Sequence, residues 1–285
     1  MSTYSIWIVS PANYPHSRCF DEVAVALNAA FCSLGIKARI VREPSKLDEI
    51  TIVLGCNLLK PNMVPTGKRL ILFNLEQIAP GSPWLTTGYL ALLREHPVWD
   101  YSLQNIGELA RMGIGATLCG IGYMPALTRI KPAREDIDVL FVGSLNERRV
   151  AVLQDLGNRG ARLRYVFNVY GRERDALIAR SKIVLNLHHH ESRVFEIVRV
   201  SYLLANRKCV VSETGLDRQY EQKLQTGIAF APYHELADVC IRLLHNPDER
   251  RTLAGVGYDR ISSLSQKEFL RRALAASNEL RRGSM

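Results

Sequence analysis

Short apolar, β-branched segments alternate along this chain with longer segments whose apolar residues recur at helical spacing. The alternation comes in two series, separated by the segment "GIGYMPALTRIKPARED" (120–136) with its two prolines and two glycines. Strand–helix alternation is typical of parallel sheets that carry helices on both faces. The chain is therefore predicted to be an α/β protein with two Rossmann-like domains that face a cleft, residues 1–125 and residues 126–285.

The apolar runs predict individual elements. The expected strands are 4–10, 37–42, 50–55, 69–74, 98–102, 115–120, 137–143, 162–169, 182–188, 208–213 and 227–232. The expected helices are 18–34, 83–95, 104–112, 146–158, 172–180, 192–205, 234–245, 248–256 and 266–281. Ligands of such sheets bind beyond the carboxyl ends of the strands, so the residues that follow each strand are the first candidates for a functional site.

Composition and the cysteines limit the class of protein. Hydrophobic residues make up 47% and charged residues 23% of the 285 residues, which is the profile of a soluble globular protein. No apolar run approaches the ~18 residues that span a bilayer, and the N-terminal segment lacks the basic stretch of a signal peptide. The six cysteines include no CxxC pair, which argues against a zinc knuckle or a redox pair. We expect a cytoplasmic protein with reduced cysteines.

The net charge of +9 is unevenly distributed along the chain. Residues 1–125 hold 10 Lys/Arg and 9 Asp/Glu, whereas residues 126–285 hold 27 and 19. The second half is therefore expected to bind an anionic ligand, such as a nucleotide or a membrane surface. The basic residues form no run of five or more and are not interleaved with aromatic residues, which argues against nucleic acid as a partner.

The segment "FVGSLNERR" (141–149) combines a strand, a turn and the start of a helix. Gly143 and Ser144 allow a tight turn in which the backbone approaches a ligand, and the first helical amides favour an anion. Arg148 and Arg149 could complete a phosphate clamp, because guanidinium groups match phosphate oxygens. The alternative is an ordinary turn with two solvated arginines. The chain contains neither GxGxxG nor GxxxxGK[ST], so no dinucleotide fingerprint or P-loop is predicted.

The stretch "LNLHHHESRVFEIVR" (185–199) places three histidines where a strand ends. Strand alternation directs His188 and His190 to one side and His189 to the other, adjacent histidines are poorly placed to bind one metal ion, and no HExxH is present. We therefore predict no metal site. Glu196, on the first turns of the next helix, could accept from ribose hydroxyls, or it could form a surface ion-pair ladder.

Four segments carry a resemblance to a known family: "VLFVGSLNERR", "SKIVLNLH", "RVFEIVRVSYLLANRKCVVSE" and "GIAFAPYHELADVCIRLL". They resemble the carboxy-terminal, nucleotide-sugar-binding domain of GT-B glycosyltransferases, most of all the group 1 transferases and their spore-maturation-protein-like relatives. "LILFNLEQ" and "HPVWDYSLQN" look like the acceptor half of the same subgroup. The resemblance implies a metal-independent transferase that moves a sugar from a nucleotide-diphosphate donor to a glycan or lipid-linked acceptor, with no further cofactor.

The resemblance also suggests which residues meet the donor. The segment that follows the "LNLH" strand, from His188, would lie at the diphosphate, and a nearby glutamate would bind the ribose. The larger family has two glutamates in this region, but Arg193 and Ser201 stand at those positions, which leaves Glu196 and Glu213 as the available carboxylates. Tyr170, which follows the strand at 162–169, is a further candidate for donor binding.

An inverting transferase needs a base for the acceptor hydroxyl, and the first half offers two candidates. His16 lies in the loop after the first strand and carries an imidazole, which titrates near neutrality. Glu76 follows the strand "RLILFN". Asp100 ranks third and is expected to be mainly structural. His16 could instead be an ordinary surface residue.

Other functions remain compatible with these patterns. A nucleotide-sugar epimerase or hydrolase could use the same fold, because one architecture serves several reactions. A non-catalytic nucleotide-sugar-binding protein is favoured by the missing pair of glutamates. Peripheral contact with the inner face of a membrane is compatible with the positive charge and with a lipid-linked acceptor.

Overall fold

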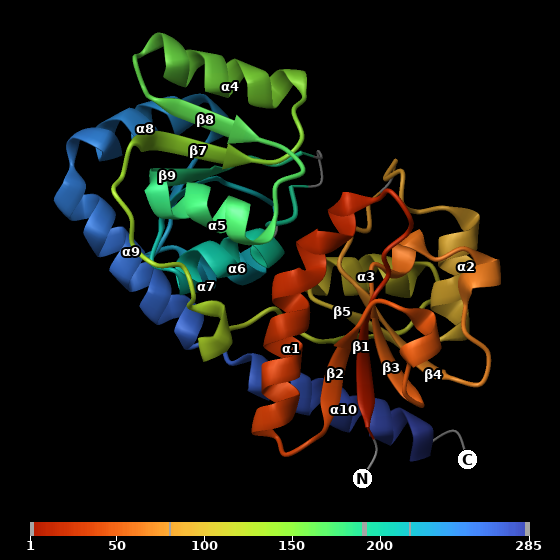
Figure 1. The fold of residues 1–285 in the computed structure, drawn as a ribbon. Helices are drawn as coiled ribbons and strands as arrows, with labels where there is room; N and C mark the ends of the chain where they lie inside the picture. The colour runs from red at the N-terminus through yellow and green to blue at the C-terminus, as the bar shows by residue number, and fades with distance from the viewer. Residues whose placement is uncertain (1–2, 80, 190–192, 217, 283–285) are drawn as a thin grey trace. The chain divides into compact units, whose positions relative to one another are not determined.

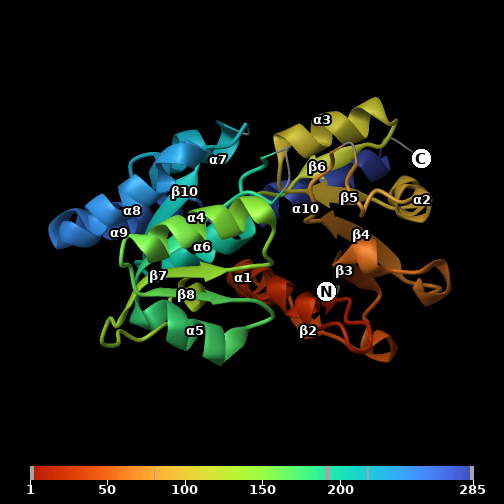
Figure 2. The ribbon, with the colours of Figure 1, turned by 90° about the horizontal axis from the view of Figure 1, so that it is seen from above.

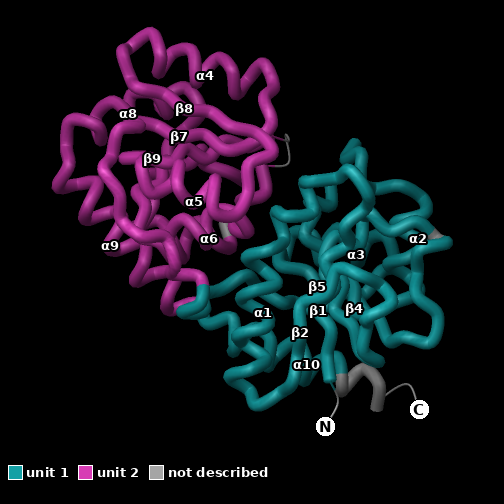
Figure 3. The backbone as a smooth tube through the Cα atoms, in the orientation of Figure 1, with its two compact units in different colours: residues 1–126, 265–285 teal, residues 127–264 magenta. Residues whose placement is uncertain are grey.

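The computed structural model describes residues 3–79, 81–189, 193–216 and 218–282. The chain forms two compact units, one of residues 1–126 and 265–285 (unit 1) and one of residues 127–264 (unit 2), as Figure 3 shows. Each unit is built around a parallel sheet with helices on both faces (Figure 1). The predicted α/β class and the two Rossmann-like domains are therefore confirmed.

Unit 1 contains a six-stranded sheet in the order β2-β1-β3-β4-β5-β6. Its strands are β1 (Tyr4–Ile8), β2 (Ala38–Val41), β3 (Ile50–Leu54), β4 (Arg69–Asn74), β5 (Val98–Asp100) and β6 (Ala116–Leu118). Its helices are α1 (Asp21–Ser33), α2 (Thr87–Glu95), α3 (Leu103–Arg111) and α10 (Gln266–Arg282), and its short 3₁₀ segments are η1 (Pro15–Phe20), η2 (Pro44–Lys46), η3 (Cys56–Leu58) and η4 (Pro61–Met63). Every residue of β3 is buried, as expected for a central strand with both faces covered.

Unit 2 contains a five-stranded sheet in the order β11-β10-β9-β7-β8. Its strands are β7 (Ile137–Val142), β8 (Leu163–Val166), β9 (Ser181–Asn186), β10 (Cys209–Glu213) and β11 (Ala229–Ala231). Its helices are α4 (Glu147–Asn158), α5 (Gly171–Arg180), α6 (Ile197–Ala205), α7 (Arg218–Leu224), α8 (Leu236–His245) and α9 (Pro247–Ser262), with η6 (Tyr233–Glu235) before α8; η5 (Pro125–Leu127) lies where the two units join in sequence. Helices α4 and α8 cover one face of this sheet, and α5 and α6 cover the other (Figures 1 and 2).

The expected strands are all present, but three helical predictions need correction. The helix expected at 83–95 begins only at Thr87, after the N-cap residue Thr86. The helix expected at 192–205 begins only at Ile197, because Arg193 has φ +44°, in the left-handed region that a helix cannot contain. The helix expected to end at residue 256 continues to Ser262. Helix α7 was not predicted, because its seven residues are too few to show helical periodicity.

The assignment of residues 126–285 to one domain also needs correction, because α10 belongs to unit 1. It packs against α1, beside which it lies in Figure 1, and against β6, beside which it lies in Figure 2. The indole Nε1 of Trp99 donates to Ser277 Oγ at 2.9 Å, and the ring of Phe269 lies against Gly120. Residues 265–285 carry five basic and two acidic residues, so the net charge is +4 for unit 1 and +5 for unit 2. The charge difference along the sequence therefore does not favour unit 2 as the anion-binding half.

Gln266 attaches the start of α10 to the segment after β6. Its Oε1 accepts from the backbone N–H of Gly122 at 2.8 Å, and its Nε2 donates to the carbonyl of Gly120 at 3.1 Å. Gln266 and both glycines are buried. Gln266→Ala would leave two buried backbone groups without partners, at roughly 1–3 kcal/mol each. We expect chemical denaturation to show a loss of about 2–4 kcal/mol in the free energy of unfolding, against little change for the exposed Gln154→Ala. Equal stability of the two variants would contradict this role.

Candidate active site

The carboxyl ends of β7, β9 and β10 bring several candidate residues together in unit 2. Glu213, the last residue of β10, is only 1% exposed. It accepts from Arg148 Nη1 at 2.9 Å, from Arg148 Nη2, and from the backbone N–H of His188 at 3.2 Å. Because parallel strands all end at the same edge of a sheet, residues from distant parts of the chain meet here.

Tyr233 makes two further contacts with Arg148. The ring of Tyr233 lies under its guanidinium, 4.1 Å from the ring centroid, and the hydroxyl of Tyr233 donates to the Arg148 carbonyl at 2.7 Å. The hydrogen bonds with Glu213 raise the pKa of Arg148 above its usual value. About a third of its side chain remains exposed, so Arg148 is a charged group that a ligand can reach.

Arg149 differs from its neighbour, because it is 2% exposed. Its Nη1 donates to the carbonyl of Ser144 at 2.9 Å and its Nη2 donates to the carbonyl of Leu187. Burial, together with the charge of nearby Arg199, lowers the pKa of Arg149 to about 10. Gly143 lies against this side chain, since a Cβ on the glycine would be 3.4 Å from Arg149 Nη1. Arg149 therefore ties the β7–α4 turn to the end of β9 and, unlike the partly exposed Arg148, is not a solvated arginine.

His188 and Glu196 form a second buried pair at this edge. The Nδ1 atom of His188 lies 3.2 and 3.1 Å from the two carboxylate oxygens of Glu196. Glu196 also accepts from Asn186 Nδ2 at 2.9 Å, and Asn186 Oδ1 accepts from Arg199 Nη1 at 3.2 Å. Glu196 therefore belongs to a partly buried network and not to the surface ion-pair ladder that was its alternative role. It lies just before the first turn of α6, as the N-cap residue of that helix.

Burial alone would lower the pKa of His188, but the hydrogen bond and charge of Glu196 raise it above the ordinary histidine value. Burial alone would likewise raise the pKa of Glu196, but His188 and Arg199 lower it. Both shifts favour the charged forms of the pair, an imidazolium and a carboxylate. The Nε2 atom of His188 is buried and has no hydrogen-bond partner among the described residues.

Gly215 and Glu221 complete the surroundings of His188. A Cβ on Gly215 would lie 2.4 Å from the carbonyl oxygen of Arg193 and 3.0 Å from His188 Nε2, so only glycine fits. The backbone N–H of Gly215 donates to Glu221 Oε1, and the charge of Glu221 contributes to the raised pKa of His188. Neither Glu221 nor Asn186 was among the predicted residues. Asn186 could have been found as the polar last residue of an apolar strand, whereas Glu221 lies on the short helix α7, which gave no signal.

The remaining donor-binding candidates lie around this cluster. Ser144 is half-buried in the β7–α4 turn, and Tyr170 is the half-buried N-cap residue of α5, after β8. Arg193 is exposed, and its carbonyl accepts from the N–H of Leu216 at 3.3 Å. His190, one of the three consecutive histidines, lies outside the described residues. Within the described ranges, no three His, Cys, Asp or Glu residues are grouped so that they could hold a metal ion.

In unit 1, Glu76 follows β4 and remains partly exposed. Its carboxylate accepts from Asn57 Nδ2 at 3.2 Å. Burial raises the pKa of Glu76 to about 7, although the bond from Asn57 opposes this. A carboxyl group that titrates near neutral pH is suited to general base catalysis.

Asp100 lies at the centre of a buried polar network beside Glu76. Its carboxylate accepts from Asn74 Nδ2 at 2.6 Å, from the backbone N–H of Ser102 at 2.8 Å and from Asn105 Nδ2 at 3.1 Å. Burial raises the pKa of Asp100 to about 7. The side chain is completely buried, so no acceptor could reach it, in agreement with the structural role expected for it.

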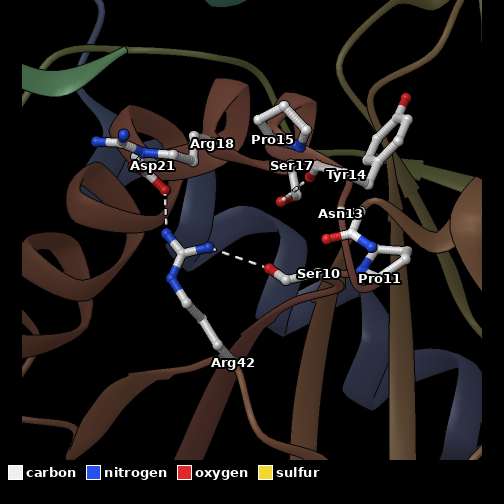
Figure 4. Close-up of a pocket in the computed structure, with 9 residues that line it drawn as sticks. All are labelled: Ser10, Pro11, Asn13, Tyr14, Pro15, Ser17, Arg18, Asp21 and Arg42. Carbon is white, nitrogen blue, oxygen red and sulfur yellow. Dashed lines mark hydrogen bonds and ion pairs between the residues drawn. The ribbon is translucent and has the colours of Figure 1, made fainter. Parts of the chain in front are cut away.

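His16 lies in η1, half-buried, with its ring centroid 5.2 Å from that of Tyr14. Next to it is a hollow of about 640 Å³ that we call the β1 hollow. Figure 4 shows Arg42 between Asp21 and Ser10 within it, donating to Ser10 Oγ at 3.1 Å. The β1 hollow is lined by Ser10, Pro11, Asn13, Tyr14, Pro15, Ser17, Arg18, Asp21 and Arg42. Polar side chains with an aromatic ring suit a hydroxyl-rich ligand.

Two units with doubly wound parallel sheets and a polar cluster at the strand ends are the architecture of the GT-B fold. Solved structures share this fold. HepE of Anabaena, in complex with UDP and glucose, is 9% identical with a TM-score of 0.64, covering 98% of this chain and 100% of that one. AviGT4, a glycosyltransferase involved in avilamycin A biosynthesis, is 16% identical with a TM-score of 0.59, covering 96% and 98%.

The family follows from the sequence. Residues 127–272 match the model of the glycosyl transferase-like family, which is half of the chain, and the protein belongs to that family. Protein L140 of Acanthamoeba polyphaga mimivirus is 26% identical over 218 residues, which are 72% of this chain and 69% of that protein. The expected GT-B glycosyltransferase is thus confirmed.

Proposed function

We propose that the protein transfers a sugar from a nucleoside diphosphate donor to a hydroxyl group of a glycan or lipid-linked acceptor. The observation that carries the proposal is the cluster of Arg148, His188, Glu196 and Glu213 at the strand ends of unit 2. Negative charge grows on the leaving diphosphate in the transition state, and preorganised positive groups stabilise it. Arg148 supplies such charge, and His188 adds to it when its imidazole is protonated; we propose that no bound metal ion is required.

The two candidate carboxylates differ in how available they are to ribose. Glu213 is 1% exposed and its oxygens accept from Arg148 and from the His188 backbone. The side chain of Glu196 is 15% exposed, and a carboxylate has lone pairs beyond those used by His188 and Asn186. We therefore assign Glu196 to the ribose and Glu213 to the orientation of Arg148.

For the acceptor we propose the β1 hollow, with the base for its hydroxyl supplied by His16 or Glu76. Tyr14 connects the two candidates, because its ring neighbours His16 and the charge of Glu76 contributes to its raised pKa. Two observations favour Glu76 as the base. Burial raises the pKa of its carboxyl to about 7, and hydrogen bonds fix its position.

A lipid-linked acceptor would bring the protein to a membrane surface. No helix within the described parts of the chain is long and apolar enough to cross a bilayer. We propose a cytoplasmic protein that makes peripheral contact through its net charge of +9, which binding to anionic vesicles at low salt would reveal. The relationship to spore-maturation-protein-like transferases likewise remains a proposal, supported by the segments "SKIVLNLH" and "RVFEIVRVSYLLANRKCVVSE".

The test of donor binding is a thermal shift with a panel of nucleoside diphosphates, beginning with UDP because HepE was solved with it. A ligand at 100 times its Kd stabilises the folded state by about 2.7 kcal/mol, which gives a readable shift. We expect at least one nucleotide to produce it, and the absence of a shift with every nucleotide would contradict donor binding.

Turnover of donor sugars, measured in EDTA with and without acceptors, then separates the possible activities. Transfer requires an acceptor, epimerisation or hydrolysis does not, and a non-catalytic binder saturates without turnover. We expect acceptor-dependent turnover in EDTA. Turnover that disappears in EDTA and returns with one divalent ion would contradict a metal-free mechanism.

A further inference from the structure

We propose that three asparagines, Asn57, Asn74 and Asn105, are positioning residues that hold Glu76 in place to take the proton of the acceptor hydroxyl. The inference rests on the proposed role of Glu76 as the base. Two of the asparagines hold the backbone of Glu76, and the third holds its carboxylate.

The backbone of residue 76 is bound from both sides. Asn74 Nδ2 and Asn105 Nδ2 each donate to the carbonyl of Glu76 at 2.9 Å. Asn74 Oδ1 accepts from the N–H of Glu76 at 3.2 Å, and Asn105 Oδ1 accepts from the N–H of Ile78 at 3.0 Å. Both asparagines are completely buried, so water does not compete for these bonds. The loop after β4 is therefore fixed where loops are otherwise mobile.

Asp100 orients both amides. Each amide has two N–H bonds, and in both cases one goes to the Glu76 carbonyl and the other to the Asp100 carboxylate. Above its pKa of about 7 this carboxylate is ionised and only accepts. The hydroxyl of Tyr89 donates to Asn74 Oδ1 at 2.8 Å, which is consistent with the same amide orientation. A buried network with every donor matched to an acceptor specifies one arrangement.

Asn57 acts on the carboxylate itself. It lies in η3, which begins after Gly55, where φ is +76° and a Cβ would come within 2.8 Å of the Phe20 ring. From there Asn57 Nδ2 donates to Glu76 Oε1 at 3.2 Å. A donor to the carboxylate favours the ionised form, so Asn57 both orients the base and opposes the effect of burial on its pKa.

The other titratable groups that interact with Glu76 are neutral at pH 7. They are Tyr14 from the β1–α1 segment, Cys56 from η3 and Tyr89 from α2. Burial raises the pKa of all three, that of Cys56 to about 12. Asp100 lies beyond the two amides and has its own pKa at about 7. Asn57 contacts Glu76 but not Asp100 in the hydrogen bonds described, so replacing Asn57 separates the two titrations.

The deciding variant is Asn57→Ala, compared with the exposed Asn158→Ala in unit 2. The readouts are the pKa of the Glu76 carboxyl, from ¹³C NMR with Glu76→Gln for assignment, and the pH profile of kcat. Losing one hydrogen bond to a charged group should raise the Glu76 pKa by roughly one unit. The kcat at pH 7 should then fall about fivefold and recover near pH 9, with the donor KM unchanged. Asn158→Ala should match the wild type throughout.

A second variant tests the backbone clamp. Asn105→Ala should lower kcat about tenfold or more at every pH, because misplacing a catalytic group by about 1 Å has effects of this size. A thermal melt checks that this variant is folded; if it is not, Asn57→Ala alone decides.

The outcomes distinguish the inference from the proposed function. If Glu76→Gln abolishes turnover while Asn57→Ala changes neither the Glu76 pKa nor the pH profile, the positioning role is wrong and the base assignment stands. If Glu76→Gln keeps a normal kcat, the base assignment fails and the inference fails with it. In that case an NMR shift in Asn57→Ala would show that the contact exists without serving catalysis.

Discussion

Glu76→Gln is expected to lower kcat by about 10²–10⁴-fold, the range found when a general base is removed. Glutamine keeps the size of the side chain and can keep the bond from Asn57 to its carbonyl oxygen, but it cannot take a proton. Donor affinity should remain nearly unchanged, because the cluster that we propose to bind the donor lies in unit 2. Steady-state kinetics with donor and acceptor varied separately measures both quantities.

The comparison variant is His16→Ala, which should keep a near-normal kcat if Glu76 is the base. The reverse pattern, with a normal rate for Glu76→Gln and a large loss for His16→Ala, would transfer the role to His16. If neither variant loses activity, a retaining mechanism without a base in unit 1 becomes the better interpretation.

The pH profile has a defined sign but does not choose between these residues. Burial raises the pKa of Glu76 to about 7, so the active carboxylate forms as the pH rises, and kcat should increase through about pH 7. The profile reports the pKa of the base but does not identify the residue, which is why the pair of variants is needed. The same shift means that folding favours the protonated carboxyl, so this group's contribution to stability falls as the pH rises from about 4.5 towards 7.

Glu196→Ala is expected to weaken donor binding about tenfold to a hundredfold, which corresponds to a charge-assisted hydrogen bond of roughly 1.5–3 kcal/mol. The variant removes the proposed partner of the ribose. It also removes the acceptor of His188 Nδ1 and the carboxylate that raises the pKa of His188, so less positive charge remains at the proposed diphosphate position. Isothermal titration with the nucleotide that gives the thermal shift measures the change.

A matched control for this loss is Glu268→Ala, which removes a carboxylate from α10 in unit 1, where it pairs with Arg271 and Arg272 on the surface. Its nucleotide affinity should equal that of the wild type. Equal affinities for Glu196→Ala and Glu268→Ala would show that the buried pair serves only the structure of unit 2.

Much of the fold could be predicted because strands and helices are local. The apolar runs at 50–55 and 137–143 predict β3 and β7 within a residue or two, since a strand buried on both faces is nearly continuously apolar. The position of α10 could not be predicted in this way. Its helical pattern shows that it has a buried face but not which unit that face covers, and the bond from Trp99 to Ser277 joins residues 178 positions apart.

The candidate site could likewise be predicted only in part. The rule that parallel strands end at one edge was enough to gather Arg148, His188 and Glu213 from the sequence, and they are in contact. The exposure and the hydrogen-bond partners of each side chain could not be predicted from the sequence. Arg148 and Arg149 are neighbours in the chain, yet one is a third exposed and the other is buried against backbone carbonyls.

The sequence by itself determined the α/β class, the order of the elements and the edge of each sheet where polar residues collect, because these depend on the period of apolar residues and on the direction of the chain. Only the tertiary structure decided which polar groups pair. Asn74, Asp100 and Asn105 come from the ends of β4 and β5 and from α3, and their hydrogen bonds depend on distances across the sheet. Burial of that network raises the pKa of Glu76 and Asp100 to about 7, a property that neither residue has in an unfolded chain.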